Sequence, residues 1–501
     1  MKKTKFNLNE EIEKIIKKFD INNSWSGNIL KDIKNYEQKK FRKNSFKRQD
    51  LKTIDFITID GEDAKDFDDA VYCEKIDNNW KLYVAIADVA HYVDKNSNID
   101  KEAKKRGTST YFPGYVVPML PEVLSNNLCS LRPGEDKFVI TAEILINKNG
   151  EIKSFKFYNA VINSSARLTY NQVNVFLKNK TIVKDKGVIK NLNNLFSLYK
   201  SLKKNREKRN AVDFDTQEFS FVIGKDNNIK GIKNNARLES QKIIEECMIA
   251  ANVASSLFIK KNKQKSLYRV HDEPSIEKIE DAAIALKNLG YSFTKSKIPN
   301  TEEINKIIEI SKKRMDDNLV STIILRAMAR AEYTPKNIGH YGLSLKSYNH
   351  FTSPIRRYPD LIVHRIIKDI IEKNKSQYNL DNLEKIGLLS SENERNSEAA
   401  ERELQSILLC NYAEKFVGKK FNATINTVVN FGLFIAVDNE PIQGLIHISS
   451  LGNEYFVHKE KKNILIGEKS KKVYKVGDKI NVKLVSAFPS EKKIDFILAN
   501  K

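Results

Sequence analysis

A run of acidic side chains near the start of the chain constrains its fold more than any other feature. Within the segment TIDGEDAKDFDDAV, six carboxylates occupy ten positions: Asp60, Glu62, Asp63, Asp66, Asp68 and Asp69. Carboxylates packed this closely repel one another, so the pKa of at least one must rise unless a cation neutralises the group. We therefore expect the fold to bring a cation, and specifically a divalent metal ion, to this loop.

Four of these acids have a spacing, D-x5-D-x-D-D, that suits a metal site: Asp60, Asp66, Asp68 and Asp69. Oxygen-only ligands favour Mg²⁺ or Mn²⁺, which keep some water and share their site with substrate phosphate. Two such ions about 4 Å apart can activate water for phosphoryl displacement. A calcium loop does not fit, because one begun at Asp60 places Ala64 at position five and one begun at Asp66 places Val71 where glycine is required. The competing interpretation is a solvated acidic turn.

The rest of the chain is basic. Its formal net charge is +22 and its isoelectric point is near 9.4. Such an excess favours RNA, DNA or an anionic membrane as partner, although a Lys-rich translation of an AT-rich genome would produce the same excess. An acidic pocket within a basic chain favours a metal that faces nucleic acid.

The cysteines and the apolar runs indicate the compartment. Cys73, Cys129, Cys247 and Cys410 lie far apart and form no CxxC pair, so we expect buried thiols in a reducing environment. No apolar run approaches the roughly 18 residues of a membrane-spanning helix. The basic N-terminus contains acids and lacks the apolar stretch of a secretory signal. We expect a cytoplasmic protein with no membrane contact.

The hydrophobic pattern predicts a mixed α+β core. Residues 1–50 form a polar, Lys-rich extension in which Ile12, Ile15, Ile16 and Phe19 predict one amphipathic helix. From about 53 to 160, ITID, AVYCEKI and WKLYVAIADVAHYV predict strands, with a hairpin turn at 77–79. The acidic run follows the first of these strands, and the ends of strands commonly carry catalytic groups.

From about residue 238 the pattern becomes helical. Ser275 can cap a helix that stops at Gly290, another helix follows Pro359, and a long one spans about 380 to 415. In the segment LESQKIIEECMIAANVASSLFIKK the expected apolar face consists of Leu238, Ile244, Met248, Ala251 and Phe258.

A second domain is expected after residue 417. The five short apolar segments FNATINTVV, FGLFIAV, GLIHISSL, DKINVKLVSA and KIDFILA predict a small Greek-key barrel of the OB type. Phe431, Phe434 and His447 lie on or beside these strands, where such rings can stack on single-stranded bases; alternatively Phe434 belongs to the core. The Lys-rich stretch 459–475 is either a phosphate-tracking loop or a solvated one.

A second basic constellation lies in FTSPIRRYPD, residues 351–360. Pro354 and Pro359 stiffen the segment on either side of Arg356 and Arg357. Two guanidinium groups on a restrained loop can hold a phosphate through bidentate hydrogen bonds. The alternative is a structural ion pair with Asp360.

Two tyrosines lie near basic groups. Tyr111 is in TSTYFPGYVVPMLP, and Tyr268 lies beside Arg269 and His271. Bases stack on such rings with roughly 1–3 kcal/mol each. An aromatic residue in an apolar run is more often part of the core, so both interpretations stay open for Tyr268.

Taken together, these segments resemble the RNase II/RNase R (RNB) exoribonuclease family. TIDGEDAKDFDDAV, GTSTYFPGYVVPMLPEVLSN, IIEECMIAANV, YRVHDEPS and GHYGLSLKSYNHFTSPIRRYPDLIVHR look like family segments in the family's order. The resemblance covers roughly 50–500, and the acidic segment is more similar to the RNase R branch. The C-terminal FGLFIAV and GLIHISSL resemble the S1-type RNA-binding domain. We therefore expect an extension at 1–50, an RNB catalytic domain at 51–415 and an OB-fold domain at 417–500.

The resemblance implies a processive 3′→5′ exoribonuclease that depends on Mg²⁺, with Mn²⁺ as a possible substitute. It would act on single-stranded RNA, taken 3′ end first, and release nucleoside 5′-monophosphates. Nothing in the sequence demands a partner subunit, so we expect a monomer. The implied metal ligands are Asp60, Asp66, Asp68 and Asp69, and the implied catalytic residues are Asp68, Asp69 and Arg356. The implied RNA contacts are Tyr111, Tyr268, Glu332 and Arg357, joined by Phe431, Phe434 and His447 on the barrel.

The chain departs from the family pattern at both ends. Residues 1–50 are too few for the two cold-shock domains that usually precede the catalytic core, and the Lys-rich tail of many RNase R proteins is missing. Substrate capture and the handling of duplex RNA are therefore open. Two other hypotheses are a catalytically decayed RNA-binding scaffold and a nuclease that acts on DNA, since discrimination rests on contacts to the 2′-OH.

Overall fold

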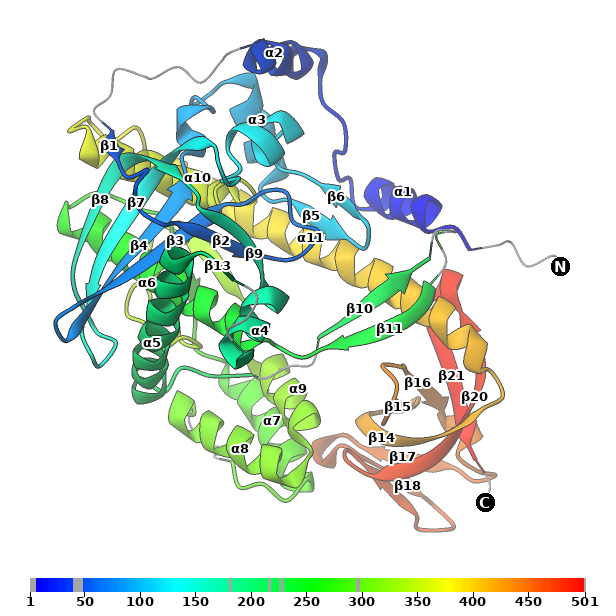
Figure 1. The fold of residues 1–501 in the computed structure, drawn as a ribbon. Helices are drawn as coiled ribbons and strands as arrows, with labels where there is room; N and C mark the ends of the chain where they lie inside the picture. Colours follow the sequence, from blue (N-terminus) through cyan, green and yellow to red (C-terminus); the bar gives the residue numbers. More distant parts are fainter. Residues whose placement is uncertain are drawn as a thin grey trace.

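A computed structural model describes residues 6–38, 48–179, 183–214, 218–224, 227, 229–293 and 298–499. A seven-stranded mixed sheet, a set of helices around it and a small β-barrel make up the fold (Figure 1). The expected α+β architecture is confirmed. Among the described residues, no helix combines the length and apolar character needed to cross a bilayer.

The seven-stranded sheet carries the acidic loop. Its strand order is β1-β8-β7-β4-β3-β2-β9, with parallel pairing only for β1 with β8 and β2 with β9. The bounds are β1 (Gln49–Asp50), β2 (Ile57–Asp60), β3 (Asp69–Ile76), β4 (Asn79–Ala87), β7 (Asp136–Ile146), β8 (Ile152–Asn163) and β9 (Ala166–Thr169).

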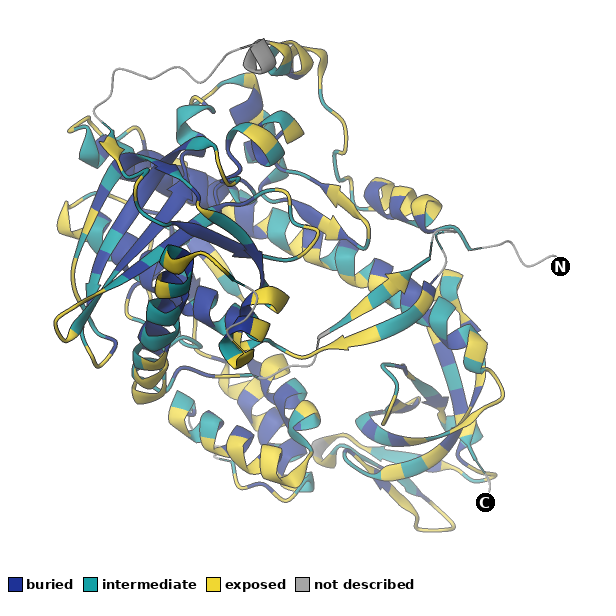
Figure 2. Ribbon diagram, in the orientation of Figure 1, coloured by how far each residue is buried: buried dark blue, intermediate teal, exposed yellow. Residues whose placement is uncertain are grey.

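The predicted hairpin joins β3 to β4. Ile76 pairs with Asn79, and Asp77 in the turn has a φ of 51°, a left-handed conformation that Asp and Asn adopt more readily than most residues. Six successive residues of β4, Leu82 to Ala87, are buried. The central strands are therefore covered on both faces, as their dark blue colour shows in Figure 2.

Helices α5 (Lys186–Lys208), α6 (Glu239–Lys261) and α10 (Tyr358–Ile371) pack against the sheet. The sequence predicted α6 with a single apolar face, and this was wrong in detail. Ile243, Cys247 and Ala254 are buried together with Ile244 and Ala251, whereas Met248 and Phe258 are only partly buried. The helix lies between the sheet and other helices, so more than one stripe is covered.

The remaining helices lie at the edges of the core. Ser275 accepts a hydrogen bond from the amide of Lys278 and caps α7, as predicted. The helix α2 was not predicted; part of its segment, and all of 1–5 and 39–47, lie outside the residues whose side chains are described. The bounds are α1 (Leu8–Lys18), α2 (Gly27–Gln38), α3 (Asn98–Arg106), α4 (Tyr170–Asn179), α7 (Ile276–Asn288), α8 (Thr301–Arg314), α9 (Asp317–Ala327) and α11 (Leu380–Ala413).

The predicted long helix is α11, whose 34 residues span about 50 Å. It crosses the molecule from the sheet to the barrel (Figure 1). Its first turns bury Leu383 and Ile386 in the main core, and its middle buries Leu404 against α1. The N-terminal helix α1, predicted only as part of an extension, therefore packs against the same long helix as the main core.

Three two-stranded antiparallel sheets complete the described part of the core; the first two are hairpins, whereas the strands of the third lie far apart in the sequence. They are β5 (Thr110–Phe112) with β6 (Tyr115–Val117), β10 (Glu218–Ile223) with β11 (Ile229–Asn235), and β12 (Tyr268–His271) with β13 (Ala331–Thr334). Short helical turns are η1 (Val89–His91) and the π-helix η2 (Val123–Leu128).

The C-terminal barrel is closed, in the order β14-β15-β16-β21-β20. Its strands are β14 (Lys420–Val429), β15 (Gly432–Val437), β16 (Gln443–His447), β20 (Lys479–Phe488) and β21 (Lys493–Leu498), which match the five predicted segments. The stretch 459–475, predicted as a loop, instead contributes to a three-stranded sheet of β17 (Phe456–Lys459), β18 (Ile464–Gly467) and β19 (Val473–Lys475). Leu465 and Tyr474 bury their side chains there, which fixes the register.

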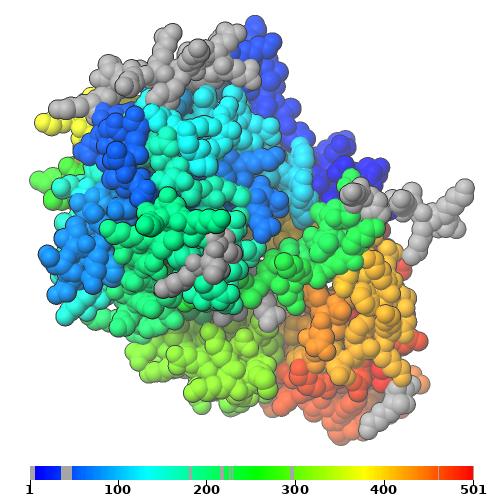
Figure 3. Space-filling view, viewed as in Figure 1, coloured from blue at the N-terminus to red at the C-terminus, as the bar shows by residue number. Residues whose placement is uncertain are grey.

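The barrel shares a hydrophobic cluster with the helices α7–α9. Arg326 on α9 donates to Thr427 Oγ1 (2.9 Å), and Asn288 on α7 donates to the carbonyl of Lys462 (2.8 Å). In the space-filling view the orange and red barrel lies beside the green helices (Figure 3). The barrel is thus anchored to the core by packing as well as by the chain.

Candidate active site

The acidic loop connects the end of β2 to the start of β3. Asp60 is the last residue of β2 and Asp69 is the first of β3, so the sheet itself holds the two ends of the loop. Glu62 and Asp63 are exposed, whereas Asp68 is buried and Asp60, Asp66 and Asp69 are partly buried. The four acids with metal-site spacing therefore face inward, and the other two face solvent.

Asp68 is held by the arginine-bearing segment. The backbone amide of Ile355 donates to Asp68 Oδ1 (2.8 Å), and Arg356 Nε lies 3.7 Å from Asp68 Oδ2. The Arg356 side chain remains 43% exposed. Its guanidinium thus faces the acids on one side and solvent on the other, where a substrate phosphate could approach.

Burial raises the pKa of all four inward-facing carboxyls. For Asp69 the pKa rises to about 7, and for Asp68 it rises well above its ordinary value. The negative charge of a neighbouring aspartate raises the pKa further in each pair Asp60–Asp66, Asp60–Asp69 and Asp66–Asp68. The positive charge of Arg356 opposes these shifts at every one of the four. Arg356 therefore faces four aspartates whose full ionisation would leave an excess of buried negative charge.

The donor set suits a hard divalent cation in its chemistry. Carboxylate oxygens are the ligands such ions prefer, and a cation would relieve the excess charge. Within the described ranges, however, no three His, Cys, Asp or Glu side chains stand together in a way that could hold one metal ion. The four aspartates are neighbours, but as placed they do not form a coordination sphere.

Arg357 has a different role from its neighbour. It donates to Asp360 Oδ1 (2.7 Å), and the buried Asp360 also accepts from the amide of Ser353 (2.8 Å). For Arg356 and Arg357 the sequence left a structural ion pair with Asp360 as an alternative to phosphate binding. The geometry of Arg357 corresponds to that ion pair. Its expected contact with RNA stays a prediction.

Tyr111 lies beside the aspartates. Its hydroxyl is 3.5 Å from Asp66 Oδ2, and its ring is 40% exposed. The amide of Tyr111 donates to Glu401 on α11 (2.7 Å). The amide of Ser109, two residues earlier, donates to the carbonyl of Arg356 (3.0 Å). The hairpin β5–β6 and the arginine segment are thus joined next to the acidic loop.

Sequence reasoning missed two side chains at this site. Tyr170 begins α4 next to Asp60, because Asp60 pairs with Thr169 across β2 and β9. Burial raises the pKa of Tyr170, and the charges of Asp60 and Asp69 raise it further. Arg167 on β9 donates to the carbonyls of Gly61 (2.8 Å) and Glu62 (2.7 Å). No local signal points to either residue, because they reach the loop through a parallel pairing between segments more than 100 positions apart.

Comparison with known proteins assigns most of the chain to two known domain families. The RNB domain matches residues 48–373, which is more than half of the chain, and the S1 RNA binding domain matches residues 414–496. The chain belongs to the RNB family. The resemblance inferred from the sequence is therefore confirmed at the level of the family.

Relatives in the RNB family align with most of this chain. Ribonuclease R of Escherichia coli is 40% identical over 459 residues, which cover 89% of this chain and 56% of that protein. Ribonuclease R of Aquifex aeolicus is 36% identical, covering 98% of this chain and 70% of its own length. The structure of Mycoplasma genitalium RNase R in complex with ribose methylated single-stranded RNA superposes with a TM-score of 0.93 at 32% identity, covering 98% and 78% of the two chains. The chain thus spans little more than half of the E. coli relative.

Within this RNB fold, Tyr268 and Glu332 share one face of the β12–β13 ribbon. Tyr268 pairs with Thr334 and Val270 pairs with Glu332, so the two predicted residues are diagonal neighbours. Glu332 is exposed, whereas Tyr268 is 8% exposed and is mostly buried. The structure brings these two residues together, and their role toward RNA stays a prediction.

The barrel residues form a separate group. Phe431 and Phe434 are 46% and 39% exposed and pack edge to face, with ring centroids 6.1 Å apart. His447 is exposed and pairs with Gly432, which links it to the same surface. Phe434 is therefore not part of the barrel core, because its neighbours Leu433 and Ile435 fill the interior instead.

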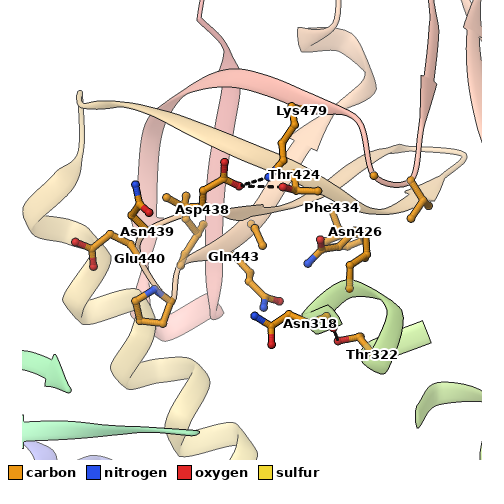
Figure 4. A pocket seen from close by; sticks show the side chains of 18 of the residues that line it. Asn318, Thr322, Thr424, Asn426, Phe434, Asp438, Asn439, Glu440, Gln443 and Lys479 are labelled. Atoms are coloured by element: carbon orange, nitrogen blue, oxygen red, sulfur yellow. Dashed lines mark hydrogen bonds and ion pairs between the residues drawn. The ribbon is translucent and has the colours of Figure 1, made fainter. Parts of the chain in front are cut away.

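A cleft of about 1520 Å³ lies between the barrel and the RNB core. Its walls include Phe434 and Gln443 from the barrel and Asn318 and Thr322 from α9 (Figure 4). On the barrel side Asp438 accepts from Thr424 (2.9 Å) and Lys479 (3.1 Å). The four aspartates do not line this cleft, so the structure places the acidic loop and the barrel aromatics at different sites.

Proposed function

We propose that this chain is a processive 3′→5′ exoribonuclease that hydrolyses single-stranded RNA to nucleoside 5′-monophosphates. The observation that carries the proposal is that Arg356 faces four inward-pointing aspartates on the loop between two sheet strands. Carboxylates beside a half-exposed guanidinium suit a phosphodiester, whose charge the arginine offsets. Family membership and the S1 match at 414–496 support RNA as the polymer.

We further propose that Asp60, Asp66, Asp68 and Asp69 hold Mg²⁺, with Mn²⁺ able to substitute. When bound, such an ion supplies activated water and stabilises the leaving oxygen. The raised pKa of each aspartate supports this assignment, because a buried carboxylate surplus favours a cation. The ligand geometry itself would have to tighten from the one observed.

Three side chains would then have different roles around the scissile phosphate. Arg356 would contact the non-bridging oxygens and stabilise the charge that builds there. Asp68, fixed by the amide of Ile355, would orient the reacting group. Tyr111 would stack on a base at the 3′ end, since its ring is partly exposed next to Asp66.

RNA contacts farther from the chemistry are proposed at three places. Tyr268 and Glu332 on the β12–β13 ribbon and Arg357 would contact the strand inside the core. Phe431, Phe434 and His447 would bind it on the barrel. We also propose that the protein works in the cytoplasm as a monomer; its four buried, unpaired cysteines support the reducing compartment.

The test is degradation of 5′-labelled single-stranded RNA by the purified chain with Mg²⁺. Stepwise shortening of the labelled strand from its 3′ end, with release of unlabelled nucleoside 5′-monophosphates and loss of both in EDTA, supports the proposal. Binding without shortening would instead support a decayed RNA-binding scaffold, and equal activity on a DNA strand of the same sequence would overturn the RNA specificity. A hairpin with a 3′ overhang reports tolerance of duplex in the same assay.

A further inference from the structure

The backbone on both sides of Asp66 is fixed by one buried hydroxyl from another part of the chain. Ser130 Oγ donates to the carbonyl of Lys65 (2.7 Å) and accepts from the amide of Phe67 (3.0 Å). The Ser130 side chain is completely buried. A hydroxyl is able to donate and accept at once, so one side chain satisfies the two peptide groups that flank Asp66.

The contact extends along the chain in both segments. The amide of Leu131 donates to the carbonyl of Phe67 (3.0 Å), and the amide of Ala87 on β4 donates to the carbonyl of Asp68 (2.9 Å). Residues 65–68 are therefore held on one side by 130–131 and on the other by the sheet. Arg167 holds the carbonyls of Gly61 and Glu62 at the other end of the loop.

The path of this backbone decides where the Asp66 carboxylate points. Ser130 fixes the Lys65–Asp66 peptide through its carbonyl and the Asp66–Phe67 peptide through its amide, so it sets the direction in which the Asp66 side chain leaves the backbone. A small rotation of the peptide on either side of Asp66 would swing the carboxylate away from Arg356 and Tyr111. Short carboxylate side chains transmit such rotations almost directly, because only two torsions separate backbone and oxygen.

We propose that Ser130 is a positioning residue for the aspartate site: its hydroxyl bridges the carbonyl of Lys65 and the amide of Phe67 and holds Asp66 in the orientation that the reaction requires. The inference rests on the proposed function for its effect on turnover. Its structural part, the restraint on residues 65–67, stands without that function.

The test compares Ser130→Ala with Ser125→Ala. Ser125 is also buried, in the neighbouring π-helix, but its hydroxyl contacts Asn126 and not the acidic loop. For Ser130→Ala we expect hydrogen exchange in the peptide spanning 61–69 to accelerate. We also expect RNA-free Mn²⁺ affinity and kcat to fall about 10- to 100-fold, as is usual when a partner that orients a ligand is removed. KM for RNA should stay within about twofold.

Ser130→Cys retains a side chain of similar shape and a weak donor. Its exchange rate at 61–69, Mn²⁺ affinity and kcat should lie between those of the parent and Ser130→Ala. It replaces Ser130→Ala if that variant fails to fold. Unchanged exchange at 61–69, or unchanged Mn²⁺ affinity and kcat despite faster exchange, would overturn the inference. An equal loss in Ser125→Ala would also overturn it, since that result would indicate a general packing defect. A parent protein that binds no Mn²⁺ and releases no mononucleotide would refute the proposed function instead, and exchange at 61–69 would then decide the positioning of Asp66 by itself.

Discussion

The amide of Ile355 donates a hydrogen bond to the buried carboxylate of Asp68, 287 residues earlier in the chain. This contact joins the acidic loop to the segment that carries Arg356. It also leaves Asp68 Oδ2 turned toward the guanidinium. The two halves of the proposed site, one acidic and one basic, are therefore positioned by each other.

Replacement of Asp68 by asparagine tests the acidic half. Asp68→Asn retains the acceptor for the amide of Ile355, so the fold should persist, but it removes the charge that faces Arg356. We expect kcat to fall by at least about 10²- to 10³-fold, as for the loss of other charge-stabilising groups, while RNA affinity stays nearly intact. The matched control is Asp63→Asn, an exposed acid of the same loop. Turnover by Asp68→Asn equal to that of the parent would refute the role of this carboxylate.

The basic half is tested with Arg356→Lys. Lysine retains the positive charge but lacks the planar fork that binds two phosphate oxygens at once. We expect kcat to drop by roughly 10²-fold without loss of folded protein, because the Arg356 side chain is 43% exposed. Single-turnover degradation of a short RNA measures this step. Lys148→Gln, which removes a positive charge in the β7–β8 turn, should behave like the parent.

The raised pKa of Asp69 predicts that the free energy of unfolding depends on pH. Burial raises its pKa to about 7, so the metal-free native state keeps a proton on Asp69 that the unfolded chain releases near its ordinary pKa. The unfolded state thus binds fewer protons between about pH 4 and pH 7, and the free energy of unfolding must fall as the pH rises through this range. The contribution is fully present below pH 4 and is lost above about pH 7.

Urea denaturation of the parent and of Asp69→Asn at pH 5 and pH 8 measures this effect. The variant carries no titrating group at this position, so its stability relative to the parent should increase from pH 5 to pH 8. Titrating groups that do not interact with Asp69 act equally in both proteins and cancel in the comparison. A constant difference between the two proteins across this range would contradict the raised pKa of Asp69.

Two substitutions of Tyr111 distinguish stacking of its ring on a base from hydrogen bonding by its hydroxyl. Its hydroxyl is 3.5 Å from Asp66, a long contact, so Tyr111→Phe should keep nearly all activity. Tyr111→Ala should lose the stacking on the 3′-terminal base, roughly 1–3 kcal/mol, and should leave longer final fragments. Tyr115→Ala, at the exposed end of the same hairpin, serves as control. Equal losses in the Phe and Ala variants would assign the role to the hydroxyl instead.

The barrel aromatics should affect binding but not chemistry. Phe434→Ala, alone or with Phe431→Ala, should weaken the affinity for long single-stranded RNA by roughly 1–3 kcal/mol per lost stack. Hydrolysis of an RNA too short to reach the barrel should be unaffected, because these rings and the four aspartates occupy different sites. Tyr455→Ala removes a more exposed ring that does not line the cleft, and it should leave RNA affinity unchanged. Fluorescence anisotropy measures the affinities, and a matching loss in Tyr455→Ala would show that any exposed ring contributes.

Local patterns determined the elements around the site. Alternating β-branched segments, the turn at Asp77 and the cap at Ser275 depend on neighbours within a few residues, and these predictions agree with the structure. The five strands of the barrel were also readable, because each is a short apolar run bounded by turns. The stretch 459–475 was misread as a loop, since its lysines hide the alternation that buries Leu465 and Tyr474.

The sequence by itself determined which side chains are available to form a site: a dense acidic loop after a strand, a stiff arginine segment, and partly exposed aromatics. Only the tertiary structure decided which of them touch. It turned Arg356 toward the aspartates and Arg357 toward Asp360, and it brought Ile355, Tyr170 and Ser130 to the loop. The physical reason is that, apart from the local Arg357–Asp360 pair, these contacts join segments 60 or more positions apart, where the pairing depends on burial and sheet register and leaves no periodic signal in the chain.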